Sequence, residues 1–128
     1  MRLLLDTQIA LWTLTGSGRL GALAQGLIED PAHEIFISTA SVWEIAIKYA
    51  LGRGDMPVSG ARAAELFTQA GYRELPIAWR HAAMVDVLPK IHSDPFDRIL
   101  IAQALTEPMR LLSRDATLAS YGVIVMPV

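Results

Sequence analysis

The stretch RLLLDT, residues 2–7, places three leucines directly before an acidic residue and a hydroxyl residue. A short apolar run of this kind is typical of a strand buried in a parallel sheet. The following residues, 7–14, have the pattern of a short helix. We therefore expect a buried strand that ends at Asp6 and leads at once into a helix.

The rest of the chain repeats this alternation of apolar runs and helical segments. Further strands are predicted at residues 34–38, 72–77, 110–113 and 123–128. Further helices are predicted at residues 20–28, 41–51, 61–70, 78–88 and 95–106, with a helical turn at 116–121. Strands that alternate with helices indicate a parallel sheet covered by helices. We therefore predict one α/β domain that spans residues 1–128.

Composition limits the protein class. The chain has no cysteine, which excludes disulfides and thiolate metal sites and suits a reducing compartment. Asp6 interrupts the first apolar run, so the N-terminus makes a poor signal peptide. No apolar stretch approaches the roughly 20 residues that span a bilayer. We expect a cytoplasmic protein with no membrane association.

Hydrophobicity and charge bear on possible partners. The hydrophobic fraction is 52% in 128 residues, which predicts either exposed apolar surface for a partner or dimer, or a tightly packed core. The net charge is −2, from 13 acidic and 11 basic residues, whereas nucleic-acid-binding proteins usually carry a basic excess. If four acids bind a metal, nine remain against eleven basic residues. The mild acidity therefore does not exclude a polyanionic substrate.

Four acids follow predicted strands or begin predicted helices: Asp6, Glu44, Asp97 and Asp115. Ligands of open parallel sheets bind at the carboxyl ends of the strands, so these acids are expected at one edge. Carboxylates that converge there either raise one another's pKa values or bind a cation. Oxygen ligands favour Mg²⁺ or Mn²⁺, and such ions suit the hydrolysis of a phosphodiester.

Each acid also has a structural interpretation. Acidic residues favour helix starts, which applies to Asp6, Asp97 and Asp115. Ser41 and Glu44 fit a capping box, and Glu44 stands four residues before Lys48, the spacing of a helix ion pair. Asp94 precedes a proline and is predicted to cap the helix that begins at Pro95. Taken together, the four acids favour the metal site.

Several other residues leave alternatives open. Arg98, Arg114 and Lys48 neighbour the acids and could hold a backbone phosphate, or form solvated faces and salt bridges. His92 could touch substrate or be a solvated loop residue. The motif GSGRLG, residues 16–21, follows a helix and not a strand, so we interpret it as a loop and not as a dinucleotide site. The three tryptophans, Trp12, Trp43 and Trp79, are predicted to lie in the core.

Four stretches resemble the PIN-domain ribonucleases, in particular the VapC-like toxins of type II toxin–antitoxin pairs. They are RLLLDT (2–7), SVWEIAIK (41–48), DPFDRILIAQA (94–104) and LLSRD (111–115). The resemblance implies a three-layer α/β/α fold with a mainly parallel sheet, and a Mg²⁺- or Mn²⁺-dependent endoribonuclease that hydrolyses RNA. It also implies a homodimer and a cognate antitoxin that covers the site.

Position by position, the resemblance implies that Asp6, Glu44 and Asp97 bind the metal, with Asp115 as a fourth, more variable acid. Thr7 and Ser113 match hydroxyl residues that support the site, while Asp94 lies outside the shared metal positions. Gln8 stands where the family commonly carries histidine.

Three other functions compete with this one. The protein could be an RNA- or DNA-processing nuclease without a toxin role, or a non-catalytic binding module with a PIN-like fold. A phosphatase with Asp6 as nucleophile is a more remote interpretation, because Gln8 replaces the second acid of its D-x-D-x-T signature.

Overall fold

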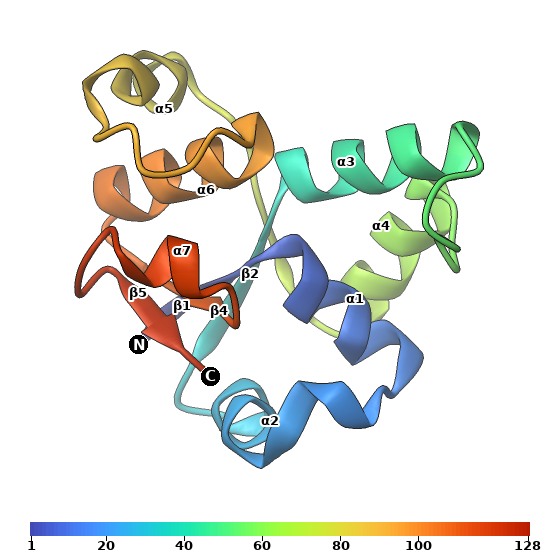
Figure 1. Ribbon diagram of the computed structural model, residues 1–128. Helices are drawn as coiled ribbons and strands as arrows, with labels where there is room; N and C mark the ends of the chain where they lie inside the picture. Colours follow the sequence, from blue (N-terminus) through green and yellow to red (C-terminus); the bar gives the residue numbers. More distant parts are fainter.

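Five parallel strands form one central sheet in a computed structural model that describes residues 1–128 (Figure 1). The strands are β1 (Arg2–Leu5), β2 (Glu34–Ser38), β3 (Arg73–Leu75), β4 (Arg110–Ser113) and β5 (Val125–Pro127). Their order is β3-β2-β1-β4-β5, and every neighbouring pair is parallel. The predicted parallel α/β fold is confirmed.

Seven α-helices and two 3₁₀ turns connect the strands. The helices are α1 (Thr7–Thr15), α2 (Gly21–Glu29), α3 (Thr39–Ala50), α4 (Gly60–Gln69), α5 (Trp79–Met84), α6 (Pro95–Thr106) and α7 (Ala116–Ala119). The 3₁₀ turns are η1 (Gly18–Leu20) and η2 (Val85–Val87). No helix has the length and apolar character needed to cross a membrane.

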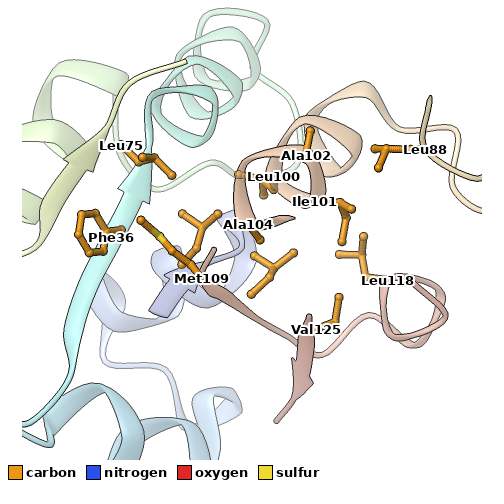
Figure 2. Close-up of a cluster of buried hydrophobic side chains, with 12 residues drawn as sticks. Phe36, Leu75, Leu88, Leu100, Ile101, Ala102, Ala104, Met109, Leu118 and Val125 are labelled. Carbon is orange, nitrogen blue, oxygen red and sulfur yellow. The ribbon is translucent and has the colours of Figure 1, made fainter. Parts of the chain in front are cut away.

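The helices cover both faces of the sheet, because successive strand residues point to opposite sides. On one face, Leu4 of β1 belongs to a cluster with Leu100 and Ile101 of α6 (Figure 2). On the other face, Leu3 and Leu5 belong to a second cluster, which includes residues of α1, α3 and α4. Two cores separated by one sheet give the three layers implied by the resemblance.

The strand order reverses between β1 and β4. The chain runs from β1 outward to β2 and β3, and then returns to place β4 on the other side of β1. The backbone N–H of Asp6 donates to the carbonyl of Leu112 at 3.1 Å, which joins the carboxyl ends of these two strands. In open α/β sheets a ligand crevice forms at this reversal.

Helix α3 begins earlier than predicted, at Thr39, because the Ser38 side chain caps it by accepting from the Ala40 N–H. Glu44 therefore lies in the second turn and not in the first. The capping-box interpretation of Ser41 and Glu44 is wrong, since Ser41 is itself inside the helix.

Some other element bounds differ from the predictions. The predicted helix at 78–88 divides into α5 and η2, and Leu88 is extended because the following proline disfavours a helical conformation. The loop at 16–21 contains η1. The strands β3 and β5 are shorter than predicted: β3 stops before Pro76, and Val123 at the start of the predicted last strand is exposed.

The tryptophan prediction is wrong for two of the three residues. Trp43 is 59% exposed and Trp79 is 96% exposed, whereas Trp12 is partly buried against the second core cluster. Other large apolar side chains are also exposed, including Tyr49 and Leu51 near the end of α3. Part of the high hydrophobic content is thus at the surface, as one of the two alternatives predicted.

Candidate metal centre

A cavity of about 950 Å³ lies where the sheet reverses direction. The four acids expected at the edge of the sheet all line it: Asp6, Glu44, Asp97 and Asp115. Asp94 lines it as well. The four acids come from the end of β1, from α3, from α6 and from the residues after β4. Segments far apart in the sequence therefore bring their carboxylates into one space.

Asp6 is buried at the centre of this arrangement. Its side chain is the N-cap of α1 and accepts from the Ile9 N–H at 2.8 Å. The Ser113 hydroxyl also forms a hydrogen bond with Asp6, and it accepts from the Asp115 N–H at 3.0 Å. Ser113 thus connects two of the four acids.

Thr7 supports the site in a different way. Its hydroxyl donates to the Ser41 hydroxyl at 2.9 Å, and both side chains are buried. This bond ties the start of α1 to α3. It therefore fixes the helix that carries Glu44 relative to the strand end that carries Asp6.

Glu44 projects from α3 with only 7% of its surface exposed. Its Oε2 lies 2.7 Å from the Lys48 Nζ, so the expected helix ion pair is confirmed. Trp43 packs edge-on against Phe96 of α6, with 5.3 Å between ring centres. This contact sets α3 against the start of α6.

Asp97 lies in the first turn of α6. Asp94 is the N-cap and accepts from the backbone N–H groups of Phe96 and Asp97, at 2.8 and 3.3 Å. Pro95 occupies the first helical position. The predicted capping role of Asp94 is confirmed, and the cap directs the following turn, with Asp97, toward the cavity.

Asp115 caps α7 by accepting from the Thr117 N–H at 2.8 Å, and its side chain is the most exposed of the group. His92 lies beside it. The His92 Nε2 is 3.3 Å from the Asp115 Oδ2 and 3.2 Å from the Asp97 Oδ2. His92 is therefore part of the acidic centre and not a solvated loop residue.

The sequence model of the PIN domain matches residues 3–124. The chain belongs to the PIN domain family. This PIN domain resembles VapBC2 from Rickettsia felis bound to a promoter DNA fragment, at 12% identity, TM-score 0.71, and 99% and 98% coverage of the two chains. It also resembles FitAcB from Neisseria gonorrhoeae, at 23% identity, TM-score 0.65, and 97% and 96% coverage.

A third similar structure is Mycobacterium tuberculosis VapC20, described as a sarcin–ricin loop cleaving toxin. It shares 16% identity at a TM-score of 0.66, over 98% of this chain and 99% of that chain. No protein of curated function matches the chain. The structural matches confirm the PIN fold.

Burial and mutual repulsion disturb the carboxylates of the PIN domain. Burial raises the pKa of Asp97 to about 7, and the charges of Asp94, Glu44 and Asp6 add to this effect although His92 opposes it. Burial also raises the pKa of Asp6, against hydrogen bonds from Ser113 and the Ile9 N–H. A cation placed among these groups would offset the repulsion and favour their ionised forms.

The pKa of Asp115 shifts in the opposite direction. Burial would raise it, but hydrogen bonds from the Thr117 N–H and from His92 hold it below its ordinary value. Asp115 is thus more readily ionised than Asp6 or Asp97 before any cation binds.

The donor set fits a hard divalent cation. Asp6, Glu44, Asp97 and Asp115 offer only carboxylate oxygens, which Mg²⁺ and Mn²⁺ prefer. One donor atom each from His92, Asp97 and Asp115 lies within 4.8 Å of the others, and Asp6 and Glu44 line the same cavity outside this group. The acids of this PIN domain could therefore hold such an ion.

Basic side chains surround the acids. Arg114 and Lys48 line the cavity, together with two residues that the sequence did not indicate, Arg19 and Arg53. The Arg114 guanidinium lies over the Trp12 ring at 5.5 Å. A cavity lined by both acidic and basic side chains can bind a cation and also a phosphate chain.

Arg98 is not among the residues that line the cavity. Its guanidinium donates to the carbonyls of Val85, Pro89 and His92. These bonds hold the loop before α6 in place. Its contribution to the site is thus indirect, through the position of His92.

Proposed function

We propose that this protein is an endoribonuclease that uses Mg²⁺ or Mn²⁺ to hydrolyse RNA phosphodiesters. The observation that carries the proposal is the convergence of Asp6, Glu44 and Asp97, with Asp115 beside them, in one cavity. Two of these acids have raised pKa values, as expected for a site completed by a cation. No protein nucleophile motif competes with this chemistry.

Asp6, Glu44 and Asp97 would hold the ion, with Asp115 as a fourth and more exposed ligand. When bound, the ion supplies Lewis-acid polarisation of the phosphodiester and lowers the pKa of water. The Ser113 hydrogen bond lowers the pKa of Asp6 against the larger effect of burial, and Thr7 fixes α1 against α3. Arg114 and Lys48, which line the same cavity, would bind backbone phosphates of the RNA.

We further propose that the protein is the toxin of a toxin–antitoxin pair, acting in the cytoplasm as one domain. One similar structure is described as a toxin–antitoxin complex from Klebsiella pneumoniae, and another as a toxin that cleaves the sarcin–ricin loop. Exposed apolar residues on and beside α3, such as Trp43 and Leu51, supply surface for a homodimer or for an antitoxin.

A cleavage assay tests the enzymatic proposal. RNA should be cut by the purified protein with Mg²⁺ or Mn²⁺ and left intact with a chelator. Asp97→Asn should keep the circular dichroism spectrum. Its cleavage rate should fall by more than the roughly 10- to 100-fold loss that is typical when a residue contacting a metal ligand is removed. Asp86→Asn, an exposed acid outside the cavity, is the matched control. Undiminished cleavage by Asp97→Asn would contradict the proposal.

Two further assays separate the alternatives. Induced expression should arrest growth if the protein is a toxin, and co-expression of a small neighbouring reading frame should relieve the arrest. An active nuclease that leaves growth unaffected would instead favour an RNA- or DNA-processing enzyme. Calorimetric binding of Mn²⁺ without any turnover of RNA would favour a non-catalytic module.

A further inference from the structure

His92 stands between the two outer acids of the centre. Its Nε2 faces the carboxylates of both Asp97 and Asp115, at 3.2 and 3.3 Å. Two further contacts hold the residue. Its backbone N–H donates to the Tyr121 hydroxyl at 3.0 Å, and its backbone carbonyl accepts from the Arg98 guanidinium. Its side chain is 18% exposed. These two contacts fix the backbone of His92, from which the ring projects toward the acids.

The position of the ring proton follows from a backbone contact. The Asp94 N–H points at the His92 Nδ1, with 3.1 Å between the nitrogens. A nitrogen that accepts this bond must present its lone pair, so the proton of the neutral ring is on Nε2. Nε2 is therefore a donor, and it faces two carboxylates that can only accept when ionised.

This tautomer decides between two roles for His92. A metal-ligating Nε2 needs a free lone pair, with the proton on Nδ1, where it would meet the Asp94 N–H. The spacing of His92, Asp97 and Asp115 alone would permit a three-ligand site. The backbone contact favours a hydrogen-bond donor and disfavours a ligand.

We propose that His92 is a positioning residue that donates its Nε2–H to the carboxylates of Asp97 and Asp115 and holds them at the spacing a cation requires. This inference rests on the proposed metal-dependent function. Groups that orient metal-ligating carboxylates typically change metal affinity about 10- to 100-fold when removed. The other oxygen of Asp97 stays available to the ion, and that of Asp115, which accepts from the Thr117 N–H, keeps a second lone pair for it.

The ring assignment is tested first on the metal-free wild-type protein. Nitrogen-15 NMR correlated to the ring protons distinguishes the two neutral tautomers of each histidine. The Nε2–H tautomer is expected for His92, with assignment by loss of the signals in His92→Gln. The Nδ1–H tautomer would overturn the proposal. The tautomer itself is read from the wild-type spectrum, and the variant serves only to assign the signal.

The second test is Mn²⁺ binding, followed by electron paramagnetic resonance. His92→Phe should weaken the affinity about 10-fold or more, and His92→Gln, whose amide restores a donor near the Nε2 position, should recover most of it. His33→Gln is the matched control, since the His33 ring contacts the Leu27 carbonyl and not the carboxylates that His92 faces. Unchanged affinity in His92→Phe would overturn the positioning role.

Pulsed electron paramagnetic resonance on the Mn²⁺-loaded wild type distinguishes a His92 that binds the metal from a His92 that only donates a hydrogen bond to the acids. The proposal predicts no directly coordinated imidazole nitrogen, and a strong nitrogen-14 coupling that disappears in His92→Gln would overturn it. A wild-type protein that binds no Mn²⁺ or Mg²⁺ would instead remove the proposed function, while the tautomer in the metal-free protein would still decide the ring assignment.

Discussion

The ammonium of Lys48 and the carboxylate of Glu44 form an ion pair of 2.7 Å on adjacent turns of α3, within the acidic cavity. Glu44 is almost buried, whereas the Lys48 side chain is 43% exposed. The lysine thus occupies an oxygen that the proposed ion would need. Because Lys48 is the more exposed partner, a cation can displace it without moving the helix.

Lys48→Gln should therefore tighten Mg²⁺ binding in the absence of RNA, by a few-fold, because the competing charge of a partly exposed pair is worth only about 1 kcal/mol. The same change should weaken RNA binding, since one positive charge leaves the cavity wall. Calorimetry gives the first value and fluorescence anisotropy the second. Weaker Mg²⁺ binding by Lys48→Gln would argue against competition at Glu44.

Asp97 should make the metal-free protein less stable as the pH rises. Its pKa is about 7 in the folded protein and 3.8 as the ordinary value, so the folded state keeps a proton that the unfolded chain has lost. Its favourable contribution is complete below about pH 4 and is lost as the pH rises to about 7, by at most roughly 1.4 kcal/mol per pH unit. Above pH 7 the effect levels off.

Urea denaturation with a chelator at pH 5 and pH 8 measures this effect, with Asp97→Asn as the comparison. The variant should gain stability relative to the wild type between the two pH values, because asparagine cannot ionise. Adding Mn²⁺ at pH 8 should stabilise the wild type more than the variant. Parallel pH dependence of the two proteins would contradict the raised pKa of Asp97.

Ser113 should set the acidic limit of activity. Its hydrogen bond lowers the pKa of Asp6, so Ser113→Ala should raise that pKa, and the acidic limb of the kcat/KM profile should move to higher pH. The variant should also lose about 1 kcal/mol of stability with the buried hydrogen bond. Ser120→Ala, at the exposed end of α7, is the control. An unmoved acidic limb would show that Asp6 does not control it.

Arg114 should bind RNA through the geometry of its guanidinium as well as its charge. The group lies over Trp12, and its Nε donates to the Val128 carbonyl at 3.2 Å. Arg114→Lys keeps the charge and loses this geometry, so RNA affinity should fall with little change in its salt dependence. Arg114→Ala should in addition lower the slope of log binding constant against log salt concentration by about one.

These RNA affinities are best measured in the Asp97→Asn background, where cleavage is expected to be absent. Arg62→Lys, on the exposed surface of α4, is the matched control. If Arg114→Lys binds RNA as tightly as the protein that keeps the arginine, the role of Arg114 is reduced to its charge alone.

The sequence was sufficient for the sheet and for most of the candidate centre. Apolar runs such as Leu3 to Leu5 are long enough for strands and too short for helices, which fixed the alternation of elements. The acids then followed from the rule that parallel strands end at one edge, and Asp6 and Asp115 lie where that rule placed them.

What the sequence did not reveal depends on contacts between distant segments. His92 is 23 residues from Asp115, and its ring tautomer depends on a backbone N–H that no pattern of residue types specifies. The exposure of Trp43 and Trp79 was also missed, because hydrophobicity alone does not separate core from surface in a helix with apolar residues on several sides.

Local competition explains the wrong helix start. Ser38 and Ser41 both offer a hydroxyl near the beginning of α3, and the sequence favoured Ser41 because it pairs with Glu44 at the spacing of a capping box. The cap is Ser38, at the very end of β2, and Ser41 is instead used by Thr7. Ser41 thus lies inside the helix and contributes to the contact between α1 and α3.

The most direct test of the account is the position of an ion in a crystal soaked with MnCl₂. Anomalous scattering at the manganese edge should give a peak among the carboxylates of Asp6, Glu44 and Asp97, and the peak should be absent from Asp97→Asn crystals. A peak elsewhere on the protein, or none at saturating Mn²⁺, would contradict the claim that these acids form a metal centre.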